Sequence, residues 1–264
     1  MKKRVSYVDG AMAKSRKPQF FIGTASWTIP KQSRDDFFPP KAVKPNHLLA
    51  YSAKLTGVEI NSSFYREHQG KTYLKWAEST PENFRFAVKL AKRFTHVQKL
   101  KVDATDLKVV LEGILQLGEK LGTLLVQIPP KLAFDEGAAE DFFATIRDLY
   151  DGAIVFEPRH ETWASREATR VLEDYRVARV VADPNRIGDA PIVKSAEISY
   201  FRLHGSPKVY YSNYTKRALD KWVNAIEDVA SKKAQTWCIF DNTALGHATP
   251  NALYVQKQLL KKFP

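Results

Sequence analysis

The chain has 264 residues, of which 44% are hydrophobic and 27% charged, and this globular composition excludes wholesale disorder. No apolar run approaches the ~18 residues of a membrane helix, the basic start lacks the apolar stretch of a secretory signal, and the single cysteine, Cys238, excludes an internal disulfide. We therefore expect a cytoplasmic protein that has no membrane contact. The net charge of +12 favours anionic partners.

The first 18 residues show no apolar periodicity, and residues 1–17 carry six basic side chains against Asp9. They predict a flexible basic N-terminal arm ahead of one domain at 19–264. From there, short apolar runs rich in β-branched and aromatic residues alternate with segments of helical period. These runs predict eight strands, at residues 20–24, 57–61, 84–89, 123–128, 153–157, 177–182, 198–204 and 236–241.

The segments between the strands predict helices. Residues 106–121 and 215–231 place apolar side chains on one face, and a last helix is expected to open with Thr249 as N-cap and Pro250 as its first residue. Residues 183–197 contain two prolines and a glycine and leave little room for a helix. Strands spaced about 31 residues apart and alternating with helices predict an α/β fold, a single-domain (β/α)8 TIM-like barrel.

Active sites in such barrels lie at the carboxyl ends of the strands, where polar residues are the informative ones. Because side chains alternate across a strand, Glu59 and Asn61 share one face, as do Glu157 and Arg159, and Arg202 and His204. Their opposite-face neighbours are apolar, so one consistent facing directs the polar set into the barrel. The predicted site comprises Glu59, Asn61, Lys89, Glu157, Arg159, His160, Arg202, His204, Asp241 and Asn242.

Several stretches of the sequence resemble the DUF72 (YecE-like) family of uncharacterised bacterial barrel proteins. The most specific are the blocks Glu-Ile-Asn-Ser-Ser-Phe-Tyr-Arg at 59–66 and Glu-Pro-Arg-His at 157–160, joined by Arg-Leu-His-Gly at 202–205 and Phe-Asp-Asn at 240–242. The first loop departs from the pattern, with Thr-Ala-Ser-Trp at 24–27 where many members have Thr-Ser-Gly-Trp. The resemblance implies a barrel and brings no established reaction.

The sequence favours an enzyme that acts on a small anionic, phosphorylated substrate. In this hypothesis Arg159 and Arg202 hold the anion, and Glu157 or Glu59 transfers protons with His204. Lys208 lies in the loop after the seventh predicted strand, a common phosphate-binding position in barrels. Substrate binding is thus expected at Asn61, Lys89, Arg159, His160, Arg202, Lys208, Asp241 and Asn242.

Two alternatives remain open. The basic arm and the basic residues between 89 and 108 would suit a nucleic-acid-binding protein or a barrel nuclease. Glu59 and Glu157, three strands apart, would suit the paired carboxylates of a glycoside-acting enzyme. A divalent metal cofactor is not favoured, because Arg159 and Arg202 compete with a metal for the same carboxylate oxygens.

Overall fold

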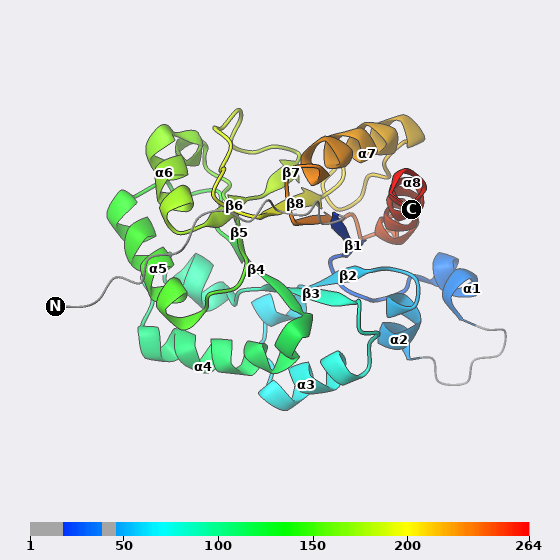
Figure 1. Cartoon of the computed structure of the whole chain (residues 1–264), viewed down its shortest axis with the longest axis horizontal. Coiled ribbons are helices and arrows are strands. Elements are labelled where there is room, and N and C mark those ends of the chain that lie inside the picture. Colours follow the sequence, from blue (N-terminus) through cyan, green and yellow to red (C-terminus); the bar gives the residue numbers. More distant parts are fainter. Residues whose placement is uncertain (1–17, 39–45, 264) are drawn as a thin grey trace, which may run out of the picture.

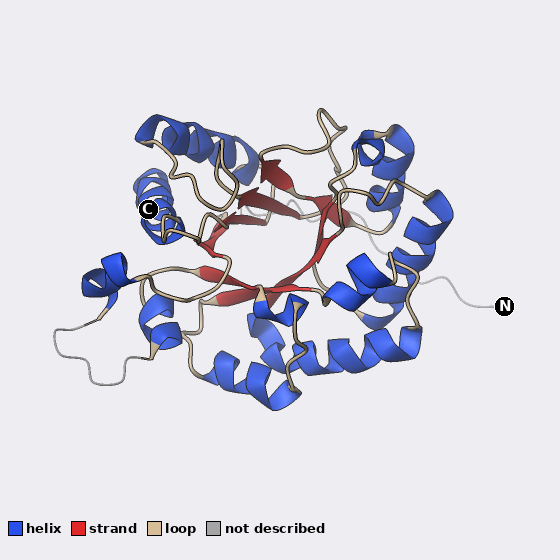
Figure 2. Ribbon diagram, turned by 180° about the vertical axis from the view of Figure 1, so that it is seen from behind, coloured by secondary structure: helices blue, strands red, loops and turns tan. Residues whose placement is uncertain are grey.

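The computed structural model describes residues 18–38 and 46–263. Its strands form the centre of the molecule and its helices lie outside them (Figure 2). The strands are β1 (Gln19–Thr24), β2 (Gly57–Ile60), β3 (Arg85–Lys89), β4 (Leu121–Gln127), β5 (Ile154–Glu157), β6 (Val177–Arg179), β7 (Val181–Asp183), β8 (Ile198–Leu203) and β9 (Gln235–Phe240). All eight predicted strands are present, and the sixth is divided into β6 and β7.

Helices and strands alternate along most of the chain, as the colours of Figure 1 show. The helices are α1 (Arg34–Phe37), α2 (His47–Ser52), α3 (Gly70–Glu78), α4 (Ala104–Ile114), α5 (Glu136–Leu149), α6 (Arg166–Asp174), α7 (Lys216–Ala230) and α8 (Ala248–Lys262). The exceptions to the alternation are that α1 and α2 both precede β2, and that β6, β7 and β8 follow one another with no α-helix in the described residues between them. No helix in the described ranges is long and apolar enough to cross a membrane. The predicted arm at 1–18 lies outside the described residues, except for Pro18.

The strands form two parallel sheets rather than one continuous ladder, with the orders β1-β9-β8-β7 and β2-β3-β4-β5-β6. At one junction the backbone itself connects the sheets, because only Val180 separates β6 from β7. Val180 still donates its N–H to the carbonyl oxygen of Phe156 in β5, at 2.8 Å. The prediction of a parallel α/β fold is therefore confirmed, whereas the single closed sheet of eight strands is replaced by two sheets.

At the other junction, between β1 and β2, side chains replace the backbone ladder. The Thr56 hydroxyl donates to the Phe20 carbonyl oxygen and accepts from the Ile22 N–H, both at 2.9 Å. The Tyr51 hydroxyl donates to the Gly57 carbonyl oxygen at 3.1 Å and accepts from the N–H of Thr24 at 2.8 Å. A Cβ atom at Gly23 would lie 1.9 Å from the Gly57 oxygen, so glycine allows this close approach.

The predicted helices differ from the observed ones mainly at their ends. Asp103 caps α4 by accepting from the Asp106 N–H, so this helix begins two residues early, and it gives way at Leu115 to a 3₁₀ segment in which Gly118 has a φ of 55°. The helix predicted at 215–231 is present as α7, with Thr215 as its N-cap rather than its first helical residue. The prediction for the last helix was wrong by two residues, because α8 begins at Ala248 and its N-cap is His247.

The core lies on both sides of the strands, between the strands and the helices and inside the ring of strands. Leu107 and Leu111 of α4 and Phe142 and Phe143 of α5 are buried against the outer faces of the sheets. The inner faces instead carry buried charged residues near the carboxyl ends of the strands. The parallel arrangement therefore brings polar residues from β2, β3, β4, β5 and β8 and from the end of β9 to one place.

Candidate functional site

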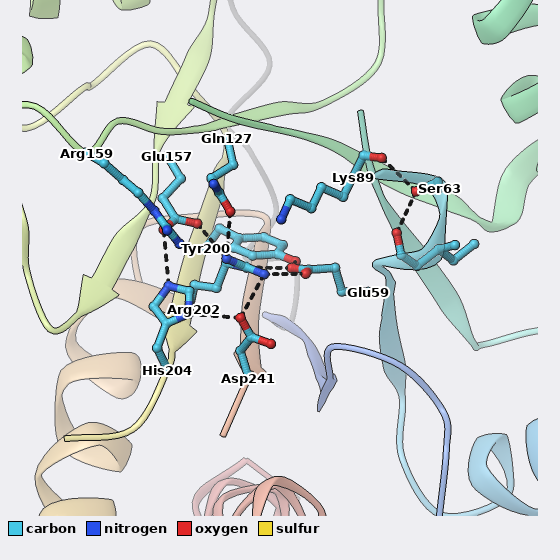
Figure 3. Close-up of polar contacts among 11 residues, drawn as sticks. Glu59, Ser63, Lys89, Gln127, Glu157, Arg159, Tyr200, Arg202, His204 and Asp241 are labelled. Atoms are coloured by element: carbon cyan, nitrogen blue, oxygen red, sulfur yellow. Dashed lines mark hydrogen bonds and ion pairs between the residues drawn. The ribbon is translucent and has the colours of Figure 1, made fainter. Parts of the chain in front are cut away.

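Arg202 on β8 lies at the centre of a buried ion-pair cluster (Figure 3). Its Nε and Nη2 atoms donate to the two carboxylate oxygens of Glu59, at 2.8 and 2.7 Å. Its Nη1 donates to Glu157 Oε2 at 2.8 Å, and Nη2 also donates to Asp241 Oδ2 at 3.1 Å. A longer contact of 3.4 Å joins Nη1 to Gln127 Oε1. All five N–H groups of the guanidinium therefore have acceptors.

His204 links two of these carboxylates a second time. Its Nδ1 lies 2.9 Å from Asp241 Oδ2, and its Nε2 lies 3.1 Å from Glu157 Oε1. Arg159 also contacts Glu157 Oε1, through Nε and Nη2, each at 3.0 Å. An imidazole with a carboxylate on each nitrogen is held in its doubly protonated form, because that form donates to both.

The cluster is almost completely buried, and its charges compensate one another. Burial opposes ionisation of Glu157, but Arg202, His204 and Arg159 outweigh that effect and hold the pKa of its carboxyl well below its ordinary value. Burial likewise opposes the charge on Arg202, and the three carboxylates still raise its pKa. Burial lowers the pKa of His204, but the hydrogen bonds that its imidazole donates to Asp241 and Glu157 raise it above its ordinary value. These groups therefore stay ionised in the folded protein.

Two residues absent from the predicted site complete the cluster. The Tyr200 hydroxyl donates to Glu59 Oε2 at 3.0 Å, and burial raises the pKa of this phenol. Gln127 at the end of β4 supplies the acceptor for Arg202 already described. Strand alternation already places Tyr200 on the same face as Arg202 and His204, and Gln127 is the polar residue at the end of the fourth predicted strand, although neither was assigned a role in binding or catalysis.

Lys89 ends β3, and its side chain extends toward the cluster from the opposite side (Figure 3). The Ser63 hydroxyl fixes its backbone, because it lies 2.6 Å from the Lys89 carbonyl oxygen and 2.7 Å from that of Ile60. The ammonium group lies 4.0 Å from the centroid of the Phe64 ring. No hydrogen-bond acceptor for this amine is found among residues 18–38 and 46–263, although the side chain is buried. The backbone of Lys89 is therefore fixed by Ser63, while its ammonium group forms no ion pair with a described residue.

A group of cations surrounds His96, a residue that follows β3. The imidazole packs edge-on against Phe64, with ring centroids 4.9 Å apart, and its Nδ1 lies 2.9 Å from the Thr95 hydroxyl. Burial, together with the charges of Lys89, Arg159 and Lys92, lowers the pKa of His96 to about 4. We call the three residues whose charges act on His96, namely Lys89, Lys92 and Arg159, the cationic group. Sequence reasoning did not place His96 in the site, because it sits on a short helical turn rather than at a strand end.

The remaining predicted residues do not join the ion-pair cluster. Asn242 is buried and donates to the Ser212 carbonyl oxygen and to Asn251, so it holds loops together. His160 accepts from the N–H of Thr162 at the start of a short turn. Lys208 is exposed, with its ammonium 4.4 Å from the centroid of the Tyr211 ring. Asn61 lies just beyond β2, and its buried Oδ1 has no partner within the described part of the chain.

The contacts within the cluster bear on two of the sequence-based expectations. Arg202 has no N–H left for an anion, because carboxylates and Gln127 occupy all five. Glu59 and Glu157, expected as bases or as paired glycosidase carboxylates, both hold the same guanidinium and are buried. Within the described ranges, no group of three His, Cys, Asp or Glu side chains is arranged to hold a metal ion.

Comparisons with known proteins identify relatives that span nearly the whole chain. The UPF0759 protein YunF of Bacillus subtilis (strain 168) is 25% identical, over 91% of this chain and 93% of its own length. The crystal structure of a DUF72 family protein from Enterococcus faecalis V583 is 20% identical, with a TM-score of 0.75, over 92% of this chain and 96% of that one.

A second DUF72 family structure, from Thermotoga maritima MSB8, is 24% identical, with a TM-score of 0.73, over 92% of this chain and 99% of that one. At these identities the two structures show a shared fold. The sequence profile of DUF72, described as a protein of unknown function, matches residues 21–263. The chain therefore belongs to the DUF72 family.

Proposed function

We propose that the protein is an enzyme that acts on a small anionic substrate held by the cationic group at the carboxyl ends of the strands. The observation that carries this proposal is the pair of cations with uncommitted donors. Lys89 Nζ has no acceptor, and Nη1 of Arg159 has none either, among the residues that the structure describes. Buried or half-buried donors of this kind need an acceptor from water or from a ligand.

The charges around His96 support an anion rather than a neutral ligand. Burial lowers the pKa of this imidazole, and the charges of Lys89, Arg159 and Lys92 lower it further, so the field of these three cations at His96 is positive. An anion in this field would be attracted by Lys89, Lys92 and Arg159 without competing for Arg202. The carboxylates would then hold Arg202 and Arg159 in place, and Arg159 would contact the substrate.

Proton transfer in this proposal belongs to Lys89 rather than to the carboxylates. Burial and the nearby Arg202 guanidinium lower the pKa of Lys89 to about 8, against the opposing effect of Glu59, Glu157 and Asp241. An amine with that pKa exchanges protons near neutral pH, which is what general acid–base catalysis requires. Glu157 and His204, in contrast, already donate to or accept from each other and their neighbours.

The proposal predicts that inorganic phosphate raises the pKa of His96. A bound anion offsets the three cations that hold the imidazole neutral, so the folded pKa should move upward from about 4 by about one unit. NMR titration of the histidine ring protons, with and without phosphate, measures this shift. His96→Gln assigns the signal.

Arg159→Gln should reduce the phosphate effect, whereas Lys75→Gln, which alters an exposed lysine on α3, should leave it unchanged. A His96 pKa that is the same with and without phosphate would refute binding of an anion in the cationic group.

A further inference from the structure

Lys89 differs from the other ionised residues around Arg202 in what its head group contacts. Each of the three carboxylates touches Arg202, and Arg159 touches Glu157. The Lys89 side chain is only 6% exposed, and its Nζ rests on the face of the Phe64 ring. Figure 3 shows this amine directed toward the cluster with no interaction drawn from it. Across the ranges 18–38 and 46–263 this amine has no acceptor, so no hydrogen bond from the described residues ties up its nitrogen.

The charged groups that face Lys89 come from several elements. Arg202 on β8 lowers its proton affinity, as burial does, whereas Glu59 on β2, Glu157 on β5 and Asp241 after β9 raise it. The resulting pKa of about 8 leaves a neutral fraction at pH 7 about 300-fold larger than that of an ordinary lysine at 10.5. Neutral amines are nucleophiles, and lysines in such surroundings form imines with carbonyl compounds.

We propose that Lys89 is a nucleophile that forms an imine with the carbonyl carbon of a small anionic aldehyde or keto acid. This inference rests on the proposed function and names its substrate class. The acid group of the substrate would lie against Arg159 and Lys92, which places its carbonyl carbon next to Lys89. The neighbouring Phe64 ring leaves one side of the amine in apolar surroundings, where water competes poorly for the carbonyl.

The reaction needs no partner beyond these two groups. The lone pair of Lys89 Nζ adds to the carbonyl carbon, a C–N bond forms, and the carbonyl π electrons move to oxygen, which takes a proton from the attacking nitrogen. The C–O bond of this carbinolamine then breaks as the nitrogen lone pair forms the C=N bond. The oxygen leaves as water, and both of its hydrogens come from the original amine.

Reductive trapping with glyoxylate tests the proposal on the full chain. Glyoxylate carries a carbonyl next to a carboxylate, and sodium cyanoborohydride converts its imine into a stable carboxymethyl-lysine. At pH 7, peptide mass mapping should find this group on Lys89 with a rate on the order of 100-fold above that of exposed lysines, because of its larger neutral fraction. Lys89→Met should show no trapping at this peptide.

The chain supplies an internal control for the effect of a lowered pKa alone. Burial also lowers the pKa of Lys120, but its amine donates to the carbonyl oxygens of Ala77 and Thr80. The Lys120 peptide should therefore stay unmodified while Lys89 reacts. Both peptides are read in the same wild-type sample, so the comparison does not depend on whether a variant folds.

Two further results separate this inference from the proposed function. If phosphate raises the His96 pKa but Lys89 reacts no faster than exposed lysines, the site binds anions and the imine is refuted. If Lys89 reacts with uncharged propanal as fast as with glyoxylate, and Arg159→Gln changes neither rate, Lys89 is nucleophilic but the anionic substrate class is wrong. Faster reaction with glyoxylate that declines in Arg159→Gln supports both.

Discussion

A single guanidinium organises the polar interior of this protein. Arg202 is 1% exposed, and Glu59, Glu157 and Asp241 surround it. A buried charge of this kind is tolerated because every donor has an acceptor and because the pKa values of Glu157 and Asp241 are lowered, so these two carboxylates stay charged beside it. Arg202 therefore fixes the carboxylate of Glu157, which in turn accepts a hydrogen bond from Arg159 and holds that guanidinium beside the cluster.

Replacing Arg202 with Met should destabilise the protein by about 3–5 kcal/mol, because the variant leaves buried carboxylates without their partner. The difference in the free energy of unfolding between the wild type and the Met variant should be largest at neutral pH. It should narrow as the pH falls below the ordinary carboxyl value of 4.5, because the wild-type protein then also loses the stability that its depressed Glu157 pKa provides.

Urea unfolding at pH 7 and pH 4 measures both effects of the Arg202 change. Arg202→Lys, which keeps the charge but has fewer donors, should lose less stability than Arg202→Met. Wild-type stability in the Met variant at neutral pH would show that the cluster tolerates unpaired carboxylates and would contradict this account.

The sequence predicts most of the residues that lie in the cluster, but it does not predict which of their hydrogen-bond donors stay available for a ligand. Strand alternation places Glu59, Glu157 and Arg202 on one face, because side chains two residues apart point the same way. The sequence does not reveal which donors are left over after the ion pairs form. That is why Arg202 was expected to bind substrate together with Lys89 and Arg159, whereas only Lys89 and Arg159 keep donors without an acceptor in the part of the chain that the structure describes.

The elements meet least regularly where β1 approaches β2. Thr56 and Tyr51 supply hydrogen bonds there that a backbone ladder supplies elsewhere. The sequence pattern predicts eight strands that all pair through backbone hydrogen bonds. It gives no sign of this junction, because the hydrogen bonds there come from two side chains outside the strands. The division of residues 177–182 into β6 and β7 escaped prediction for a similar reason, since a continuous apolar run hides a bend.

Replacing Thr56 with Val should destabilise the protein by about 1–2 kcal/mol, because it keeps the shape of the side chain but leaves the Phe20 oxygen and the Ile22 N–H without their partner. Hydrogen exchange of the Ile22 amide should become faster. Thr56→Ser, which retains the hydroxyl, serves as the control. Unchanged exchange at Ile22 in the Val variant would mean that the junction does not depend on this hydroxyl.

The whole molecule carries a net charge of +12, and residues 1–17 contribute five of these charges. The described chain leads from Pro18 into the amino-terminal end of β1, whereas the cluster lies at the carboxyl ends of the strands. Between 89 and 108 the basic surface is partly compensated, because Arg93 pairs with Glu67 and Asp106. The nucleic-acid alternative therefore depends mainly on the arm.

Deleting residues 1–17 should leave the phosphate response of His96 unchanged, because a small anion binds at the opposite end of the strands. If nucleic acid were the ligand, the deletion would instead lower duplex affinity and flatten its salt dependence by about 0.9 in slope per lost phosphate contact. Fluorescence anisotropy with duplex DNA at several salt concentrations distinguishes these results. Tight, sequence-independent binding that disappears with the arm would contradict the small-anion proposal.

The site is shared between the two sheets, and this division has a consequence for folding. Glu59, Gln127 and Glu157 belong to the sheet β2-β3-β4-β5-β6, whereas Arg202 belongs to the other sheet, and Asp241 and His204 adjoin it. Either sheet formed alone would have to bury charges that lack their counterions, or leave them in water. A partly folded state in which only one sheet has formed is therefore higher in free energy, and this favours cooperative, all-or-none folding. The charges that fix the geometry of the candidate site therefore also couple the formation of the two sheets to each other.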